Sequence, residues 1–293
     1  MQSQDSIPNG KIIDGKAHAH SENLLTREAI TMKNATIHLV VILIGEDPAS
    51  LVYINRKRIA CEDTLIKFSL ITLPKTTDQN EALELISKYN NDPKVHGILV
   101  QQPLPPHIDK NAIVSAINPL KDVDCLNPYN VGLSLMGNGK LLPCTPAGIL
   151  TLLERENVPL KGKHAVIVGR SDIVGKPLAF LLLSKDMTVT ICHSHTKNLQ
   201  EVCNNADVLI VAVGKPKLIT SKFVKEGAIV IDVGVNRLQG KKICGDVDFE
   251  DVKHKTSYIT PVPGGVGPMT VATLLKNCLR AWELQNPLKE PVV

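Results

Sequence analysis

The sequence lacks the features that mark secreted, membrane and metal-binding proteins. It has no apolar run of the roughly 18 residues that a membrane helix needs, and residues 1–16 contain no apolar core like that of a signal peptide. Its seven cysteines are scattered and include no Cys-x-x-Cys pair, which argues against a disulfide framework or a zinc site and for a reducing compartment. We therefore expect a cytoplasmic protein with no membrane segment and no metal, and a short cleaved transit peptide stays open as an alternative.

The sequence also lacks a strong charge of either sign and any internal repeat. Its net charge of +4 over 293 residues is too small and too dispersed to indicate a nucleic-acid partner, although it suits an anionic small molecule. Apolar residues make up 43% and charged residues 21%, which is ordinary for a globular enzyme, and the length is comfortable for two domains.

Residues 164–183 read as a strand, a glycine turn and a helix. A short β-branched run at 166–168 is typical of a buried parallel strand, and Gly169 interrupts it. Gly175 and Pro177 then open an apolar segment of helix length, where proline is tolerated in the first turn. This is how a dinucleotide-binding fold presents backbone N–H groups and a helix N-terminus to a pyrophosphate.

The usual glycine fingerprint and the usual acidic residue are both missing from this region. Ser171 stands where Gly-x-Gly-x-x-Gly would need its second glycine, so an ordinary strand-to-helix connection stays possible. The next strand, 188–192, ends in the basic and hydroxyl-rich segment 193–197, where NAD enzymes place Asp or Glu. Together with Arg170, this segment suits a 2′-phosphate and favours NADP over NAD; the alternative is a polar loop that happens to be basic.

Strands alternate with helices along the chain, which predicts parallel sheets covered by helices. The first half is expected to contain strands 37–44, 66–73 and 96–101 and helices 49–64, 78–90 and 109–117. The second is expected to contain strands 164–168, 188–192, 207–213, 228–232 and 258–260 and helices 149–156, 175–184, 198–205 and 269–285.

The irregular stretch 118–146 is the expected domain boundary. We therefore predict two α/β domains with parallel sheets flanking a cleft. The first covers 1–143 and is completed by the C-terminal helix 269–287, and the second, 144–268, is Rossmann-like and binds NADP.

Two segments of the first half carry side chains suited to chemistry. Tyr53 and Lys57 are four residues apart on a predicted helix and project from one face, although Arg56 and Arg58 beside them also fit a solvated stripe. Gln101 stands where a strand ends before a proline-rich exit, so it should project from the carboxyl edge of the sheet; a plain polar strand end is the alternative.

Two further segments belong to irregular parts of the chain. Asp122 and Asp124 are more typical of a turn than of catalysis, although a fixed Asp is a good partner for an amino-pyrimidine edge. Residues 260–270 hold three prolines and three glycines, which predicts a rigid loop that lets a ligand approach closely.

Taken together, these segments resemble the bifunctional methylenetetrahydrofolate dehydrogenase/cyclohydrolase family. The matching stretches span nearly the whole chain in the family's order: 53–57, 96–101, 121–124, 143–146, 168–171, 173–175, 227–234, 245–247 and 260–270. The resemblance implies NADP-dependent oxidation of 5,10-methylenetetrahydrofolate to 5,10-methenyltetrahydrofolate, followed by hydrolysis to 10-formyltetrahydrofolate. It also implies tetrahydrofolate derivatives, including polyglutamylated forms, as substrates, and a homodimer.

The resemblance assigns a role to individual residues. Lys57 would be the general acid/base of the hydrolytic step, Gln101 would hydrogen-bond and orient it, Tyr53 would pack against the folate, and Asp124 would hold the pterin edge. The implied substrate contacts also include Pro263, Gly264 and Gly265. The implied cofactor contacts are Thr145, Gly169, Arg170, Ser171, Ser194, His195, Val235 and Gly265.

Two positions depart from the family pattern. Cys125 replaces the glycine that usually follows Lys-Asp-Val-Asp, so we expect the backbone there to avoid conformations that only glycine tolerates. Gln102 replaces a usually apolar residue beside Gln101, and strand alternation allows only one of the two glutamines to face Lys57.

Two rival functions remain. An NADP dehydrogenase of another small acid would leave the set Tyr53, Lys57, Gln101 and Asp124 unexplained. A folate-binding relative without catalysis is opposed by the intact Lys57 and Gln101.

Overall fold

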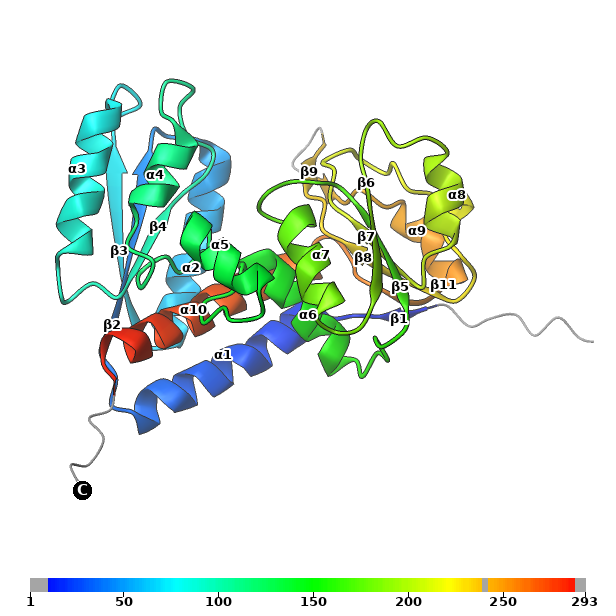
Figure 1. Cartoon of the computed structure of the whole chain (residues 1–293), viewed down its shortest axis with the longest axis horizontal. Coiled ribbons are helices and arrows are strands. Elements are labelled where there is room, and N and C mark those ends of the chain that lie inside the picture. Colours follow the sequence, from blue (N-terminus) through cyan, green and yellow to red (C-terminus); the bar gives the residue numbers. More distant parts are fainter. Residues whose placement is uncertain (1–9, 239–241, 288–293) are drawn as a thin grey trace, which may run out of the picture. The chain divides into compact units, whose positions relative to one another are not determined.

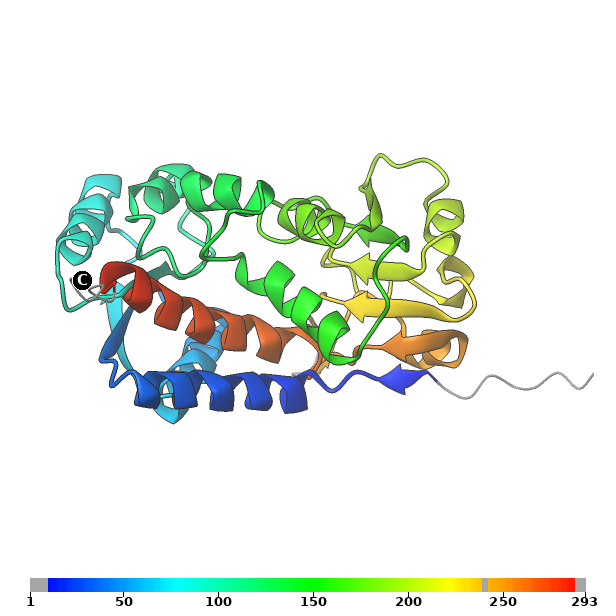
Figure 2. The same cartoon turned by 60° about the horizontal axis from the view of Figure 1, so that its bottom comes forward.

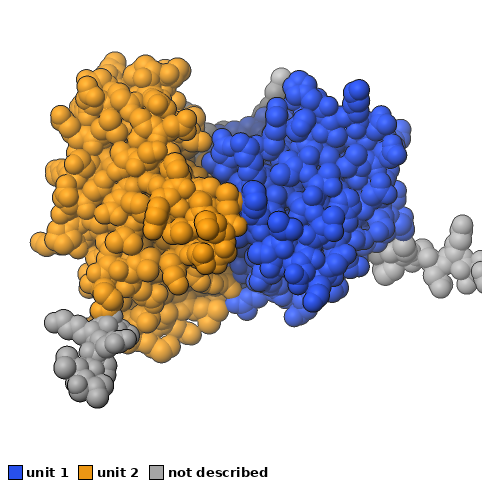
Figure 3. All heavy atoms as spheres, in the orientation of Figure 1, with its two compact units in different colours: residues 1–19, 145–270 blue, residues 20–144, 271–293 orange. Residues whose placement is uncertain are grey.

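The computed structural model describes residues 10–238 and 242–287, which form two compact units (Figure 3). Unit 1 contains the described residues up to Ala19 together with Thr145–Thr270, and unit 2 contains His20–Cys144 and the described residues from Val271. The chain changes unit within three helices: α1 (Gly15–Met32), α6 (Cys144–Arg155) and α10 (Val266–Gln285).

Unit 2 is built on a parallel three-stranded sheet of order β3 (Ile66–Leu73), β2 (Ile37–Ile44), β4 (Gly97–Val100) (Figure 1). The central strand β2 is apolar at almost every position because both of its faces are covered. Leu39, Val41 and Leu43 point into a core with residues of α1, α2 (Pro48–Asp63) and α10. The alternate residues of β2 point into a second core with α3 (Gln79–Asn90) and α4 (Lys110–Ala116).

Unit 1 is built on a sheet of six parallel strands. Their order is β1 (Lys11–Ile12), β11 (Thr256–Ile259), β8 (Ala228–Asp232), β7 (Val208–Val211), β5 (His164–Val168), β6 (Thr188–Cys192). Beside it lie α7 (Gly175–Leu183), α8 (Leu199–Asn204), α9 (Phe249–Val252) and the antiparallel pair β9 (Asn236–Arg237) and β10 (Ile243–Cys244).

The strand order of unit 1 gives it a topological switch point. The chain runs from β5 outward to β6 and then returns to β7 on the other side of β5. In sheets of this kind, ligands bind outside the carboxyl ends of the strands where the order reverses. The predicted class, two α/β domains with parallel sheets of which the second is Rossmann-like, is therefore confirmed.

The observed boundaries match five of the eight expected strands, and two other expectations differ from the structure. Strands 37–44, 66–73, 164–168, 188–192 and 228–232 have the predicted limits. The described residues up to Ala19 belong with unit 1, because β1 pairs with β11, whereas the sequence analysis placed them in the first domain. The chain is helical from Val266, so half of the expected 260–270 loop is the first turn of α10, where Pro268 needs no intrahelical N–H partner.

Two helices, α1 and α5 (Pro128–Leu135), were not predicted from the sequence. In α1, the buried positions include Glu22 and Thr26, which are 7% and 5% exposed, so the apolar period that signals a helix is absent there. Figures 1 and 2 show α1 beside α10 in unit 2, and Lys276 Nζ lies 3.5 Å from Glu22 Oε2. Among the described residues, no helix combines the length and the apolar character that crossing a membrane requires.

Candidate functional site

Helix α2 carries Tyr53 and Lys57, the two candidate site residues predicted on a helix of unit 2. The helix begins after Asp47, whose Oδ2 accepts hydrogen bonds from the backbone N and the Oγ of Ser50, both at 2.8 Å. Ile54 and Cys61 bury one face of α2 in the core. Tyr53 and Lys57 are both partly buried, so neither belongs to a fully solvated stripe.

Lys57 and Gln101 form a hydrogen-bonded pair. Lys57 Nζ donates to Gln101 Oε1 at 2.9 Å, and Gln101 Nε2 donates to the backbone oxygen of Gln102 at 2.7 Å. The backbone N–H of Gln101 donates to Ile42 O at 2.8 Å, which fixes the residue at the carboxyl end of β4. Both ends of the amide are therefore engaged, and Gln101 rather than Gln102 faces the lysine, as the sequence analysis expected.

The two aspartates of the segment 121–124 have different environments. Asp122 is 1% exposed, and it accepts hydrogen bonds from the backbone N of Asn127 at 2.9 Å and from Asn130 Nδ2 at 2.9 Å. Burial raises its pKa, and these hydrogen bonds oppose the rise. Asp122 thus holds the following turn together, whereas Asp124 is only half-buried.

Asp124 lies in the same neighbourhood as Lys57. The buried Cys144 thiol is electrostatically coupled to both: its pKa is raised well above the usual value, first by burial and then by the charge of Asp124, with an opposing effect from Lys57. Lys57 and Asp124, which come from different segments of unit 2, thus both act on the Cys144 thiol, and Gln101 is bonded to Lys57.

Cys125 adopts a backbone conformation that is unusual for its side chain. Its φ is +56°, in the left-handed region that favours glycine but that other residues can adopt at a cost. The Cys125 side chain is fully buried in the unit 2 core, and its thiol donates to Leu141 O at 3.4 Å. These contacts offset a backbone cost of about 1–2 kcal/mol.

In unit 1, the glycines of the strand-to-helix turn allow two backbone segments to touch. Gly169 has φ +135°, and a Cβ atom there would lie 2.2 Å from Ala212 O at the end of β7. A Cβ atom on Gly175 would lie 2.1 Å from Gly169 O. The glycine spacing of this turn differs from Gly-x-Gly-x-x-Gly. Its glycines nevertheless serve the same purpose, because they let the N-terminus of the helix pack closely on the strands.

A pocket of about 420 Å³ opens at the carboxyl ends of β5, β6 and β7, which is the switch point of the sheet. Its lining residues are Val168, Gly169, Arg170, His193, Ser194, Thr196, Leu199, Ala212, Val213, Lys215 and Leu218. None of the described residues that line it is an Asp or Glu, while Arg170 and Lys215 supply positive charge and Ser194 and Thr196 supply hydroxyl groups. The donors present fit the 2′-phosphate of NADP better than the free 2′-hydroxyl of NAD.

Three of the eight predicted cofactor residues, Gly169, Arg170 and Ser194, line this pocket. Ser171 instead caps its own turn, because its Oγ accepts the backbone N–H of Val174 at 3.2 Å. The other predicted positions are also outside the lining: Thr145 shares a 3.0 Å hydrogen bond with Thr270, the backbone N–H of His195 donates to His193 Nδ1, and Val235 is 46% exposed.

Of the other polar lining residues, His193 and Thr196 belong to the segment 193–197 that was expected to meet the 2′-phosphate, whereas Lys215 was not predicted. Lys215 follows β7 as His193 follows β6, so the rule that ligands meet strand ends, applied to the third strand, would have found it.

The proline- and glycine-rich loop of unit 1 uses some of its small residues for packing. A Cβ atom on Gly15 would lie 1.8 Å from Gly265 O, and one on Gly265 would lie 2.7 Å from Pro261 O. Gly265 is buried, whereas Pro263 is exposed. Gly264 has φ +112°, a conformation for which glycine is needed.

The sheet of unit 1 and the pocket at its switch point define a dinucleotide-binding fold, and unit 2 carries the hydrogen-bonded pair Lys57 and Gln101. In the described ranges, no His, Cys, Asp and Glu side chains form a group that could hold a metal ion. Two sequence models of one family match the chain. The "Tetrahydrofolate dehydrogenase/cyclohydrolase, catalytic domain" matches residues 13–124, and the "NAD(P)-binding domain" of the same family matches residues 143–286.

The chain therefore belongs to the tetrahydrofolate dehydrogenase/cyclohydrolase family. The bifunctional protein FolD of Agathobacter rectalis is 52% identical over 273 residues, which cover 92% of this chain and 98% of that protein.

Two solved structures are also similar. The crystal structure of the bifunctional FolD enzyme from Campylobacter jejuni is 48% identical with a TM-score of 0.91, covering 94% of this chain and 99% of that one. The Trypanosoma brucei FolD structure, complexed with NADP cofactor and inhibitor, is 37% identical with a TM-score of 0.91, covering 94% and 98%.

Proposed function

We propose that this chain oxidises 5,10-methylenetetrahydrofolate with NADP⁺ and hydrolyses the resulting 5,10-methenyltetrahydrofolate to 10-formyltetrahydrofolate. The observation that carries the proposal is the 2.9 Å hydrogen bond from Lys57 to Gln101 at the end of β4, in a chain of this family. A dehydrogenase of another small acid would have no use for such a pair.

In the hydrolytic reaction, a water oxygen bonds to the methenyl carbon and the bond from that carbon to N5 breaks. Lys57, as the free amine, accepts one proton from the attacking water and, as the ammonium, delivers it to N5, while the second proton of that water is released to solvent as the formyl carbonyl forms. Gln101 orients the Lys57 nitrogen through its Oε1, because its own amide is held at the other end by Gln102 O. Tyr53, on the same face of α2, packs against the folate, and Asp124 holds the pterin edge.

The chemistry of the first reaction would be supplied by NADP⁺, which would serve as acceptor for the hydride of the one-carbon bridge. The chain's part is to bind and orient. Arg170, Ser194 and His193 meet the 2′-phosphate, and Gly169 lets the pyrophosphate approach the N-terminus of α7. We also assign Thr145, Ser171, His195, Val235 and Gly265 to the cofactor surface, and Pro263, Gly264 and Gly265 to the folate surface.

The cofactor assignment is tested with Arg170→Ala, assayed with NADP⁺ and NAD⁺. We expect KM for NADP⁺ to rise by about tenfold or more, because a charge-assisted contact to phosphate is lost, while KM for NAD⁺ stays nearly constant. An unchanged ratio of the two KM values would contradict a contact between Arg170 and the 2′-phosphate.

The two activities are tested by following reduced cofactor and methenyltetrahydrofolate separately after mixing the protein with methylenetetrahydrofolate and NADP⁺. Reduced cofactor with little methenyl species is the expected result. Accumulating methenyl species would contradict the hydrolytic role of Lys57, and no reduction of either NADP⁺ or NAD⁺ would contradict the dehydrogenase.

The remaining parts of the proposal rest on the family alone. They are a homodimer, polyglutamylated folates as substrates, a cytoplasmic location, and the functional division into a folate domain, 1–143 completed by 269–287, and an NADP domain, 144–268. Analytical ultracentrifugation tests the first, and KM values for mono- and polyglutamylated substrate test the second.

A further inference from the structure

Unit 1 contains two buried aspartates that the proposed chemistry does not use. Asp232 ends β8 and is 3% exposed, and Asp246 follows β10 and is 0% exposed. A carboxylate away from water is costly unless several donors satisfy it. We refer to Asp232 and Asp246 together as the aspartate clasp.

Asp246 is bonded to the loop that forms one wall of the cofactor pocket. Its Oδ2 accepts the backbone N–H of Val213 at 2.7 Å and that of Gly214 at 2.9 Å. Its Oδ1 accepts from Asn236 Nδ2 at 2.8 Å. Val213 lines the pocket, between the lining residues Ala212 and Lys215.

Asp232 in turn holds Asp246 in place. Its Oδ1 accepts the backbone N–H of Asp246 at 3.0 Å and that of Gly234 at 2.9 Å, and its Oδ2 accepts the backbone N–H of Val247 at 2.9 Å. The segment after β10 is thereby tied to the end of β8, and through Asp246 to the end of β7. Hydrogen bonds of this kind, from backbone N–H to an ionised acceptor, are the stronger ones.

Two glycines are present because the carboxylates occupy the space beside them. A Cβ atom on Gly245 would lie 1.8 Å from Asp232 Oδ2, and one on Gly234 would lie 2.2 Å from Asp246 Cγ. The clasp is therefore a built feature, in which both acids and both glycines fit one another.

We infer that Asp246, supported by Asp232, is a positioning residue for NADP: it fixes the pocket wall at 212–215 in the shape that binds the cofactor. The inference rests on the proposed NADP site. The wall segment 212–215 follows the end of β7. Gly214 in this segment has φ +66°, and no atom lies within 4 Å of a Cβ atom added there. Such a loop has little of its own to define its shape, so an anchor outside the loop decides it.

The test compares NADPH affinity, measured by the fluorescence of the bound nucleotide, between the wild type, Asp246→Asn and the double variant Asp246→Asn/Asn236→Asp. In the single variant, two amide NH₂ groups meet at the contact with Asn236, and the wall loses a charged acceptor. In the double variant, the new carboxylate at 236 accepts from the new amide, whose oxygen can still accept from Val213 and Gly214. We expect a loss of about tenfold in the first and recovery to within about threefold in the second.

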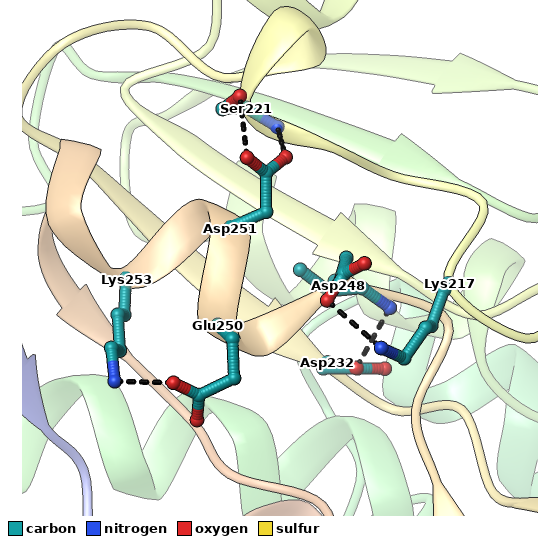
Figure 4. A network of polar contacts seen from close by, with 8 residues as sticks. Lys217, Ser221, Asp232, Asp248, Glu250, Asp251 and Lys253 are labelled. Carbon is teal, nitrogen blue, oxygen red and sulfur yellow. Dashed lines mark hydrogen bonds and ion pairs between the residues drawn. The ribbon is translucent and has the colours of Figure 1, made fainter.

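Amide hydrogen exchange at Val213 and Gly214 provides a readout that does not depend on activity. It should accelerate in Asp246→Asn and recover in the double variant, while exchange in the strands of unit 2 stays constant. Asp251→Asn is the matched control (Figure 4). Asp251 also accepts a backbone N–H and a hydroxyl, both from Ser221, but on an exposed part of unit 1, so its NADPH affinity should be unchanged.

Faster exchange in Asp246→Asn with unchanged NADPH affinity would overturn the inference, and so would a double variant as weak as the single one. A wild type that binds no NADPH would instead contradict the proposed function. If Asp246→Asn does not fold, the test uses Asn236→Ala. This variant keeps both hydrogen bonds from Asp246 Oδ2 to the wall and removes only the donor to Asp246 Oδ1. A loss of about threefold is then expected, and no loss would overturn the inference.

Discussion

The two candidate sites are constructed in opposite ways. In unit 2, the site consists of side chains with particular chemical groups, Lys57 and Gln101, held on the regular elements α2 and β4. In unit 1, the pocket is shaped largely by backbone, where Gly169 and Gly175 pack closely and a buried carboxylate fixes the wall. The first site depends on particular side-chain groups, whereas the second depends in addition on the absence of a side chain at its glycines.

This difference teaches where each site is sensitive to substitution. Removing one amine should abolish the chemistry of unit 2 and leave its fold intact. Adding one methyl group should damage the pocket of unit 1, although no reacting group is touched. The following predictions test the contrast, from the largest expected effect to the smallest.

Lys57→Met should reduce cyclohydrolase activity by about 10²–10⁴-fold, the usual contribution of a positioned acid or base, while dehydrogenase activity falls much less. Methionine keeps the length of the stem, so the fold of α2 is preserved. The rates of methenyltetrahydrofolate hydrolysis and of NADP⁺ reduction, measured separately, check the prediction. Arg58→Met on the same helix is the control, because the Arg58 guanidinium binds exposed Glu62. Equal loss of both activities would argue against a dedicated proton-transfer role for Lys57.

Gly169→Ala should reduce dehydrogenase activity by at least about 100-fold and leave cyclohydrolase activity largely intact. The added Cβ would lie 2.2 Å from Ala212 O, which neither strand can relieve without moving. Gly162→Ala is a matched control, because Gly162 also has positive φ, +74°, but no atom lies within 4 Å of its added Cβ. The control isolates the backbone strain of about 1–2 kcal/mol from the clash. Similar NADPH affinities in the two variants would show that conformational strain, and not close approach, is what Gly169 avoids.

Protonation of Asp232 should make unit 1 more stable in mild acid than at neutral pH. Burial, the largest cause, raises its pKa from 3.8 to about 6, against the effect of three backbone hydrogen bonds. Because the folded pKa lies above the unfolded one, the stabilisation is fully present below pH 3.8 and is lost as the pH rises through about 6. The free energy of unfolding should fall by up to about 3 kcal/mol over this range, because each unit of pKa difference corresponds to about 1.36 kcal/mol.

Hydrogen exchange of the β8 amides, followed from pH 4 to 7 in the wild type and in Asp232→Asn, measures this effect. The variant cannot titrate at that position, so the wild type should lose stability relative to it as the pH rises. A constant difference between the two proteins across this range would contradict the raised pKa.

The same contrast explains what the sequence could predict. Apolar runs fix strands such as β2 and β5, because a strand buried on both faces needs them. Spacing alone left Lys57 open as part of a solvated stripe and Gln101 open as a plain strand end, and the resemblance to the family singled them out. The aspartate clasp was not predicted, because the sequence around Asp232 and Asp246 is typical of turns and only the fold shows that both are buried. Helix α1 was missed for a related reason: Glu22 occupies a buried position where an apolar residue would have signalled the helix.

Cys125 combines both features of this comparison. Its side chain is buried in the core, and its backbone has a conformation that favours glycine. The core contacts of the thiol stabilise the residue, and φ +56° destabilises it. Cys125→Ala removes the sulfur and keeps the strain, whereas Cys125→Gly removes both. Glycine should therefore be the more stable of the two variants by about 0.5–1 kcal/mol, the reverse of the order expected in a helix or strand. Urea unfolding followed by the fluorescence of Trp282, the single tryptophan, reports on this core, because Trp282 packs against it. If alanine were the more stable variant, the backbone at 125 would have to leave the left-handed region once the thiol is gone, and the position of Asp124 would depend on its neighbour's side chain.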